Sequence, residues 1–130
     1  MLITDIVAQL NVSPAVTSLV NNRIGPVPAP EDLSQYPCIT YQSPSYVPEY
    51  ANEGSIGVTV VRVIFNCLSA QYLQARTLAE AVGSAFSGFS GVLPNGTRVF
   101  MAEVVNIVDG YNDGSRISRC STHVLFQFSD

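Results

Sequence analysis

The alternation of apolar and polar positions changes its period in the middle of the chain. From Val58 to Cys67, β-branched residues are dense and apolar positions recur at every second residue, which predicts a strand. From Ala70 to Phe89 they recur at every third or fourth residue, which predicts an amphipathic helix. The apolar stripe of this helix consists of Ala75, Leu78, Ala79, Val82, Ala85, Phe86 and Phe89. A long strand therefore leads directly into one helix.

The predicted strand carries apolar side chains on both faces. The face that the helix stripe can cover consists of Thr59, Val61, Val63, Phe65 and Cys67. The opposite face consists of Val58, Val60, Arg62, Ile64 and Asn66. Because the solvent side of an antiparallel strand is usually polar, the aliphatic residues of this second face predict that something covers it. The cover is either a loop or the N-terminal helix of the same chain, or a neighbouring subunit.

Two short helices are predicted at the N-terminus. Apolar residues recur at helical spacing from Leu2 to Leu10, and Asp5 in the first turn suits the helix dipole. Ser13 followed by Pro14 is a start signal for a second helix, which ends at Asn21. Residues 23–37 contain four prolines and no period, so we expect an extended strap across the surface of the domain.

A hairpin with a long tip is predicted next. Residues 38–43 read as a short strand, and residues 44–53 read as a loop between it and the long strand. This loop is longer than most hairpin connections. Tyr46 and Tyr50 lie on it beside prolines, which suits contact with a partner. Packing of the loop onto its own domain is the alternative.

Two more strands are predicted after the long helix. Pro94–Gly96 is a turn signal, residues 97–108 form a strand, residues 109–114 form a polar turn, and residues 115–128 form the last strand. By strict alternation, one face of the first of these strands consists of Val99, Met101, Val105 and Ile107, and the other of Phe100, Ala102, Val104 and Val108. In the last strand, the inward positions are Cys120, Val124, Phe126 and Phe128, and the outward positions are Arg119, Ser121, His123 and Gln127.

The predicted order is helix, helix, strand, strand, helix, strand, strand. Two hairpins that flank a helix predict an α+β two-layer sandwich, with a mainly antiparallel four-stranded sheet and the helices on one face. A length of 130 residues fits a single domain that spans residues 1–130.

The composition narrows the range of partners. Only 12% of the residues are charged, about half the usual share, which is typical of a chain that hides surface in an assembly. The six basic residues are all arginines and the net charge is −4, so no basic nucleic-acid patch is expected. No apolar run reaches transmembrane length and no secretion signal begins the chain, so we expect no membrane contact.

The sequence carries no enzyme signature. The one histidine, His123, has no carboxylate near it in the sequence, which favours a structural role on the outer sheet face. The glycines follow a helix rather than precede one, as a phosphate loop would. Asp109 and Asp113 lack the spacing of a calcium loop and are expected to be turn formers, paired with Arg116 or Arg119.

The three cysteines are Cys38, Cys67 and Cys120, which are odd in number and far apart. They are expected to be buried free thiols in a reducing compartment, and their spacing does not suit zinc. We therefore predict no catalytic residue, no cofactor and no metal.

In their order and spacing, these pieces resemble the tail-completion, or tail-terminator, proteins of long-tailed bacteriophages. The resemblance covers nearly the whole chain. It rests on the apolar N-terminal helix, residues 19–24, the strap that ends in residues 36–41, the long loop, the strand 61–65 that leads into the helix with Ala75, Leu78 and Ala79, and the acidic turn 109–113 between the last strands.

The resemblance implies a structural virion protein whose subunits form a ring, commonly a hexamer. Such a ring caps the tail tube, provides the head–tail joining surface, and has the tail tube protein and a connector or head-closure protein as partners. DNA passes through its lumen without specific binding. The implied location is the tail–neck region of the virion, with assembly in the host cytoplasm. Low charge and doubly apolar strands suit a ring subunit, which buries two different patches against its neighbours.

The resemblance also implies two contact surfaces. The candidate arm for contact with the tail tube or connector consists of Tyr46, Val47, Pro48, Glu49 and Tyr50. The candidate subunit interface consists of Val58, Val60, Arg62 and Ile64. One alternative is another neck component, such as a head-closure or connector protein. The other is a small binding domain or enzyme that uses the sheet face near His123 as a pocket.

Overall fold

A computed structural model describes residues 2–21, 23–26, 36–51, 54–112 and 117–129, and for residues 2, 43–51, 54–58, 111 and 112 it describes the backbone alone. The elements follow in the order α1 (Leu2–Asn11), α2 (Pro14–Val20), β1 (Ile24–Pro26), β2 (Cys38–Ala51), β3 (Gly54–Ser69), α3 (Tyr72–Phe86), β4 (Gly91–Val92), β5 (Arg98–Asn112) and β6 (Ile117–Ser129). Both N-terminal helices lie where the sequence predicts them. Among the described residues, no single helix could span a membrane; α1 and α2 pass that test only as a pair, which is bent by 88°.

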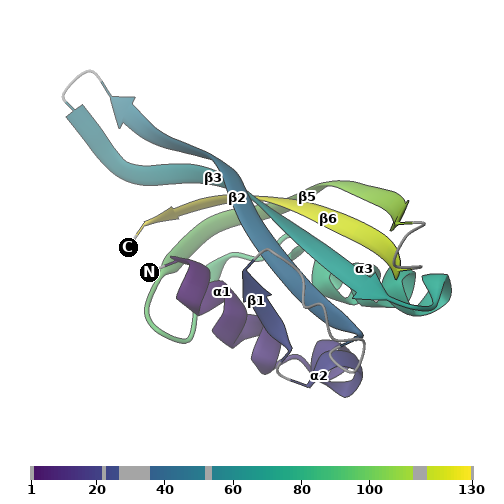
Figure 1. Cartoon of the computed structure of the whole chain (residues 1–130). Helices are drawn as coiled ribbons and strands as arrows, with labels where there is room; N and C mark the ends of the chain where they lie inside the picture. The colour runs from purple at the N-terminus through teal and green to yellow at the C-terminus, as the bar shows by residue number, and fades with distance from the viewer. Residues whose placement is uncertain (1, 22, 27–35, 52–53, 113–116, 130) are drawn as a thin grey trace.

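The sheet has six strands in the order β1-β2-β3-β6-β5-β4. β1 runs parallel to β2, and the other neighbouring pairs are antiparallel. The sheet curls over the helices, and the β2–β3 hairpin extends well beyond the rest of the molecule (Figure 1). The predicted α+β class is confirmed, but the sheet is mixed and has six strands rather than four. The sequence pattern missed β1 and β4 because strands of three and two residues are too short to show a period.

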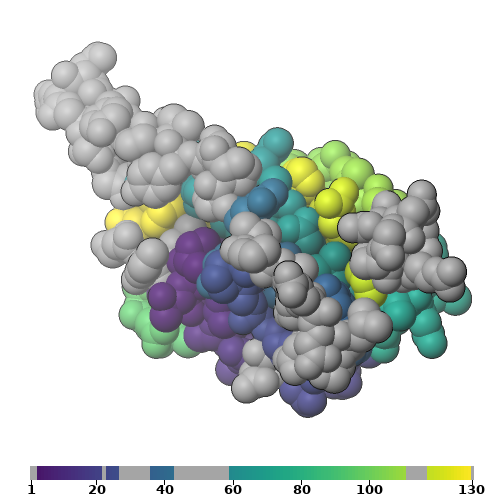
Figure 2. Space-filling model, in the orientation of Figure 1, coloured from purple at the N-terminus to yellow at the C-terminus, as the bar shows by residue number. Residues whose placement is uncertain are grey.

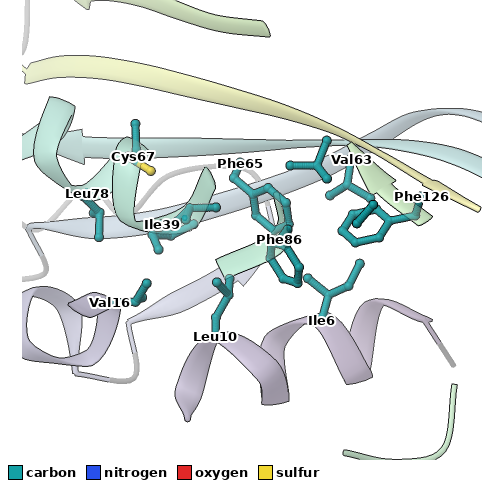
Figure 3. Close-up of a cluster of buried hydrophobic side chains, with 14 of the residues drawn as sticks. Ile6, Leu10, Val16, Ile39, Val63, Phe65, Cys67, Leu78, Phe86 and Phe126 are labelled. Atoms are coloured by element: carbon teal, nitrogen blue, oxygen red, sulfur yellow. The ribbon is translucent and has the colours of Figure 1, made fainter. Parts of the chain in front are cut away.

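The core lies between the helices and one face of the sheet. The rings of Phe65 and Phe86 stack with centroids 5.6 Å apart, and Phe86 meets Phe126 edge to face at 5.2 Å. Ile6 and Leu10 of α1 pack below these rings (Figure 3). The predicted α3 stripe is confirmed at its buried residues, which are Ala75, Leu78, Ala79, Val82 and Phe86. Each buried aromatic ring removes enough apolar area from water to stabilise the fold by roughly 2–3 kcal/mol.

Strands β3 and β6 alternate as the sequence predicts. The side chains of β3 that face the core are Val61, Val63, Phe65 and Cys67, and those of β6 are Cys120, Val124, Phe126 and Phe128. Since all of the helices that supply the core pack against this side, α1 does not cover the opposite face of β3. One of the expected covers for that face, the N-terminal helix, is therefore excluded.

Strand β5 does not alternate as predicted. Val99 pairs with Phe128 and Met101 with Gln127, so Phe100 is an extra residue; Val105 is a second one, between Val104 and Asn106. Each extra residue forms a bulge that shifts the following side chains to the other face. The core-facing side chains are consequently Val99, Ala102, Val104 and Ile107, from both of the predicted faces. The strand also runs on through Asp109, which the sequence placed in a turn.

Strand β2 is much longer than predicted. It continues to Ala51, which pairs with Gly54 of β3, so most of the predicted loop 44–53 is strand. The two prolines of the predicted loop, Pro44 and Pro48, lie at the two register shifts of this ladder. β1 pairs with β2 only as far as Tyr41. Proline is tolerated at bulges and on edge strands because no ladder hydrogen bond is lost there.

Helix α1 is fastened to the turn that precedes β5. The buried carboxylate of Asp5 accepts hydrogen bonds from the backbone N–H groups of Asn95 and Thr97, the latter at 2.9 Å. Burial raises the pKa of Asp5, but the hydrogen bonds from Thr97 and Asn95 outweigh burial and lower the pKa below its ordinary value. The contact fixes the N-terminal helix against the second half of the chain.

Candidate functional site

The sheet face turned away from the helices, called here the outer face, carries the predicted subunit interface. Register pairs align its side chains in rows across β3, β6 and β5. The three middle rows are Val60–Gln127–Met101, Arg62–Leu125–Glu103 and Ile64–His123–Asn106. Surface atoms of these three strands lie next to one another in the upper part of Figure 2.

These middle rows lie at the surface of the subunit. Arg62 and Glu103 are exposed, and Val60, Ile64 and Leu125 are half-buried. None of the described residues buries these side chains as a core would. Three of the four predicted interface residues thus lie together on an accessible surface of mixed apolar and charged character. The fourth, Val58, continues along β3, but its side chain lies outside the described residues.

The other end of the outer face is buried within the subunit. Thr40, Asn66 and Ser121 form a row across β2, β3 and β6. Ser121 donates a hydrogen bond to Asn66 at 2.7 Å, and Asn66 donates one to Thr40 at 3.3 Å. Beside this row, Tyr36 at the end of the predicted strap packs on the cluster Cys38, Leu68 and Ile117. Within the described residues, the expected intrachain cover is therefore present at this end; residues 27–35 of the predicted strap lie outside the described part of the chain.

His123 lies in the middle of the outer face, between Ile64 and Asn106. Burial and the nearby positive charge of Arg62 lower its pKa below the ordinary value of 6.5, so the imidazole is neutral at neutral pH. Its Nδ1 atom has no hydrogen-bond partner among the described residues. The hydroxyl of Ser121, two residues away, bonds Asn66 instead of the imidazole. The described residues thus give His123 no nucleophile to activate.

The predicted arm residues lie on the projecting hairpin. Their backbone belongs to β2, where Tyr46 pairs with Val61, and Val47 with Val60. The loop prediction for them is wrong. Tyr46, Val47 and Pro48 pair with residues of β3 that β6 also flanks, so of the five only Glu49 and Tyr50 lie on the part of the hairpin that projects beyond β6 (Figure 1). The side chains of Tyr46, Val47, Pro48, Glu49 and Tyr50 lie outside the described residues. The structure brings the two predicted contact surfaces together, because the arm and the interface are neighbouring strands.

Strand β5 adds exposed apolar side chains that the sequence reasoning did not single out. Phe100 is 40% exposed, Met101 46%, Val105 37% and Val108 42%. The sequence signal for them is that both faces of residues 97–108 are apolar. The two bulges place several of these side chains at the surface of the strand. The outer face is therefore bordered by an apolar strand.

A polar cluster joins α3 to the end of β5. Asp109 accepts hydrogen bonds from the hydroxyl of Tyr72 at 2.9 Å and from the thiol of Cys120 at 3.2 Å, and Arg76 approaches it at 3.5 Å. The hydrogen bond from Cys120 is the main reason that the pKa of Asp109 is lowered. Asp109 pairs with Arg76 rather than with Arg119. The predicted partners Asp113 and Arg116 lie outside the described residues. Sequence could not reveal the pairing with Arg76, because residues of α3 meet β5 only in the folded chain.

The cysteines are buried free thiols, as predicted. Burial raises the pKa of Cys38 and of Cys120 to about 11, and it also raises that of Cys67. Neutral thiols are poor nucleophiles and poor metal ligands. Within the described part of the chain, no group of three His, Cys, Asp or Glu residues is arranged to hold a metal ion.

Comparisons with known proteins agree with this geometry. A scan against protein-family models matched the family described as "Tail completion protein gp17" over residues 4–126. A search of curated proteins found no match. Among solved structures, a chain from the virion of a native gene transfer agent particle is similar, with a TM-score of 0.78 and 15% identity over 96% of this chain and 92% of that chain. The chain described here therefore belongs to the tail completion protein gp17 family of structural virion proteins.

Proposed function

We propose that this chain is a tail terminator, whose copies form a ring, commonly of six, on the finished tail tube. The ring provides the surface to which the head is joined. Its partners are the tail tube protein and a head–tail connector or head-closure protein, and DNA passes through the lumen without specific binding. This places the protein in the tail–neck region of the virion, after assembly in the host cytoplasm.

The projecting β2–β3 hairpin is the observation that carries the proposal. β6 pairs with β3 no further than Thr59, so from Gly54 to Val58 the strand has β2 as its one described neighbour. A two-stranded ribbon without a third strand or a core beneath it is marginally stable in water. Such a ribbon suits a protein that reaches onto another molecule, here the tail tube or the connector, which then supplies the missing contacts.

The outer face supports a subunit interface. Val60, Ile64 and Leu125 are half-buried aliphatic residues, and Arg62 and Glu103 lie on either side of Leu125 in one row. An apolar centre with charged neighbours is typical of interfaces between proteins. A ring requires two different patches on each subunit, one for each neighbour. The outer face is proposed as part of one such patch.

The charge of the chain suits the proposed lumen. The net charge is −4, and the basic residues are six arginines spread along the sequence. Binding to DNA in the absence of sequence recognition comes from neutralising phosphates with several basic side chains at once. An acidic ring lets DNA pass with little retention.

Removal of the ribbon tests the proposal. Because Pro48 pairs with Thr59, residues 49–58 can be replaced by Asn-Gly, which favours a two-residue hairpin turn. We expect the free energy of unfolding of this variant to lie within about 1 kcal/mol of that of the natural chain, since the variant retains every described core residue. We expect it to fail to join separately purified heads and tails. A matched control is Leu73→Ala, at a residue that is 76% exposed on α3.

The outcomes separate the proposal from its alternative. A folded variant without the ribbon that still joins heads and tails would contradict the arm. Sedimentation of the natural protein with each partner then decides its place in the neck. Binding to free tail tubes supports the terminator, whereas binding only to filled heads supports a head-closure protein.

A further inference from the structure

One edge of the sheet is open along most of β5. Ala102 accepts a hydrogen bond from the N–H of Gly88 at 3.0 Å and donates its own N–H to Phe89 at 2.9 Å, and β4 pairs with Val99 and Arg98. Beyond Ala102, no described strand pairs with this side of β5. Backbone groups alternate in direction along a strand, so those of Val104, and of Ile107 past the bulge, point to the open edge.

The opposite edge of the sheet is open along β2. β1 covers it from Ile39 to Tyr41, and from Gln42 to Ala51 no described strand pairs with it. The two open stretches, Gln42–Ala51 and Glu103–Asn112, are equal in length and lie on opposite sides of one sheet. In the part of the chain that the structure describes, each sheet edge is thus closed at one end by a short strand and open at the other.

We propose that the open β5 edge of one copy pairs with the open β2 edge of the next copy, so that the sheets of neighbouring subunits are continuous. This inference rests on the proposed ring and specifies how it closes. The occupant is a second copy of this chain because the sheet itself presents both edges of the contact. Pro44 and Pro48 have no N–H to donate, so at these two positions the β2 edge contributes carbonyl acceptors alone. Two different edges that pair head to tail form a closed ring when the rotation between copies closes.

The strand directions suit this pairing. β2, β3, β6 and β5 alternate in direction, so β2 and β5 run oppositely within one subunit. Rotation about an axis along the strands keeps the direction of β2 in the next copy. It therefore meets β5 in the antiparallel sense, like every long ladder of this sheet.

The offset between the open stretches suits a closed ring. The centre of the open β2 stretch lies near the row of Val47 and Val60. The centre of the open β5 stretch lies near the row of Ile107, Thr122 and Phe65. The separation from residue 60 to residue 65 of β3 corresponds to about 17 Å along the strand, while four strands span about 19 Å across the sheet. Neighbours that pair at this offset have strands tilted by about 40° to the ring axis, a stagger of the size that closing a sheet requires.

The open part of β5 has one bulge, at Val105, but it lacks other features that prevent edge pairing in most monomers. Such edges usually carry proline or lysine, or are very short. Residues 103–112 contain neither residue type, and the run from Asn106 to Asn112 pairs with β6 without a register shift. Val105 and Val108 are exposed apolar residues on this edge strand, at 37% and 42%. In the paired state Val108 of one copy lies near the row of Val47 and Val60 of the next.

Amide hydrogen exchange on the assembled full-length protein tests the inference. We expect the amides of Val104 and Ile107 to exchange slower by about tenfold or more in the ring than in dissociated subunits. Packing between faces alone would leave these amides without new acceptors. We also expect Val108→Lys to shift the mass measured by light scattering from ring to subunit. Val12→Lys, at a residue 66% exposed between α1 and α2, serves as the matched control and keeps the ring.

Each outcome decides a separate point. A ring in which these two amides exchange as fast as in dissociated subunits would overturn the edge pairing and leave the tail terminator proposal intact. A chain that stays a single subunit at all concentrations, and also when mixed with tail tubes, would overturn both. Protected amides in the ring, together with loss of the ring in Val108→Lys but not in Val12→Lys, would support the pairing.

Discussion

The carboxylate of Asp5 accepts the backbone N–H of Thr97 at 2.9 Å, across 92 positions of sequence. It also accepts the N–H of Asn95, so one buried side chain closes the turn that starts β5. The contact holds α1, which contributes Ile6 and Leu10 to the core, against the half of the chain that forms β5 and β6. A single ionised group therefore links the two ends of the fold.

We expect Asp5→Asn to lower the free energy of unfolding by about 1–3 kcal/mol at pH 7, because an amide cannot accept both N–H groups as a carboxylate does. The pKa of Asp5 is lowered in the folded chain, so its contribution is complete above the ordinary value of 3.8 and is lost as the pH falls through the folded pKa. Urea unfolding at pH 7 and at pH 3 measures both effects. The exposed Glu103→Gln is the control; equal stability of Asp5→Asn and the natural chain at pH 7 would refute the role.

The aromatic core gives a second expectation. Phe86 contacts both Phe65 and Phe126 and is fully buried, so Phe86→Ala leaves a cavity at the centre of the helix–sheet interface. We expect a loss of about 3–5 kcal/mol in the free energy of unfolding. Leu73→Ala on the exposed side of the same helix should change it by about 0.5 kcal/mol or less. Similar urea midpoints for the two variants would contradict the assigned core.

The outer face gives a third expectation. Val60 is half-buried and lies one strand from the open β2 edge, so Val60→Asp introduces a charge into the proposed contact between subunits. We expect the ring to dissociate while the subunit keeps its circular dichroism spectrum. Light scattering measures the mass, with Val12→Asp as control. A ring of normal mass in Val60→Asp would exclude this face from the interface.

The histidine gives a fourth expectation. The pKa of His123 is lowered from its ordinary value of 6.5 by burial and by Arg62. The unfolded chain thus binds a proton more readily than the folded one. Stability is fully present above pH 6.5 and declines as the pH falls toward the folded pKa. Because His123 is the one histidine of the chain, an NMR titration of its ring protons reports this pKa directly.

In that titration, the variant Arg62→Gln should raise the pKa of His123 toward the ordinary value, since it removes the neighbouring positive charge. Glu103→Gln should not raise it, because it removes a negative charge instead. A pKa above 6.5 in the natural chain would show that the imidazole is more solvated than the structure indicates.

The sequence by itself determined the elements whose pattern is local. The stripe of α3 and the core-facing sides of β3 and β6 follow from periods of 3.6 and 2, and the buried Phe86 and Val63 lie where those periods place them. These patterns can be recognised in the sequence because each element packs one regular face on the core. The family resemblance rested on the same ordered pieces.

The tertiary structure decided what depends on pairing between distant segments. The bulges at Phe100 and Val105 exist only relative to β6, and they reassign the faces of β5. The prolines of β2 read as loop residues until β3 pairs beside them, and β1 is a strand only because Ile39 and its neighbours lie alongside it. Likewise, Asp5 finds Thr97 and Asp109 finds Arg76 across long stretches of sequence. Hydrogen bonds between strands carry no periodic signal in a single sequence, so the fold alone fixes the open edges and the projecting hairpin.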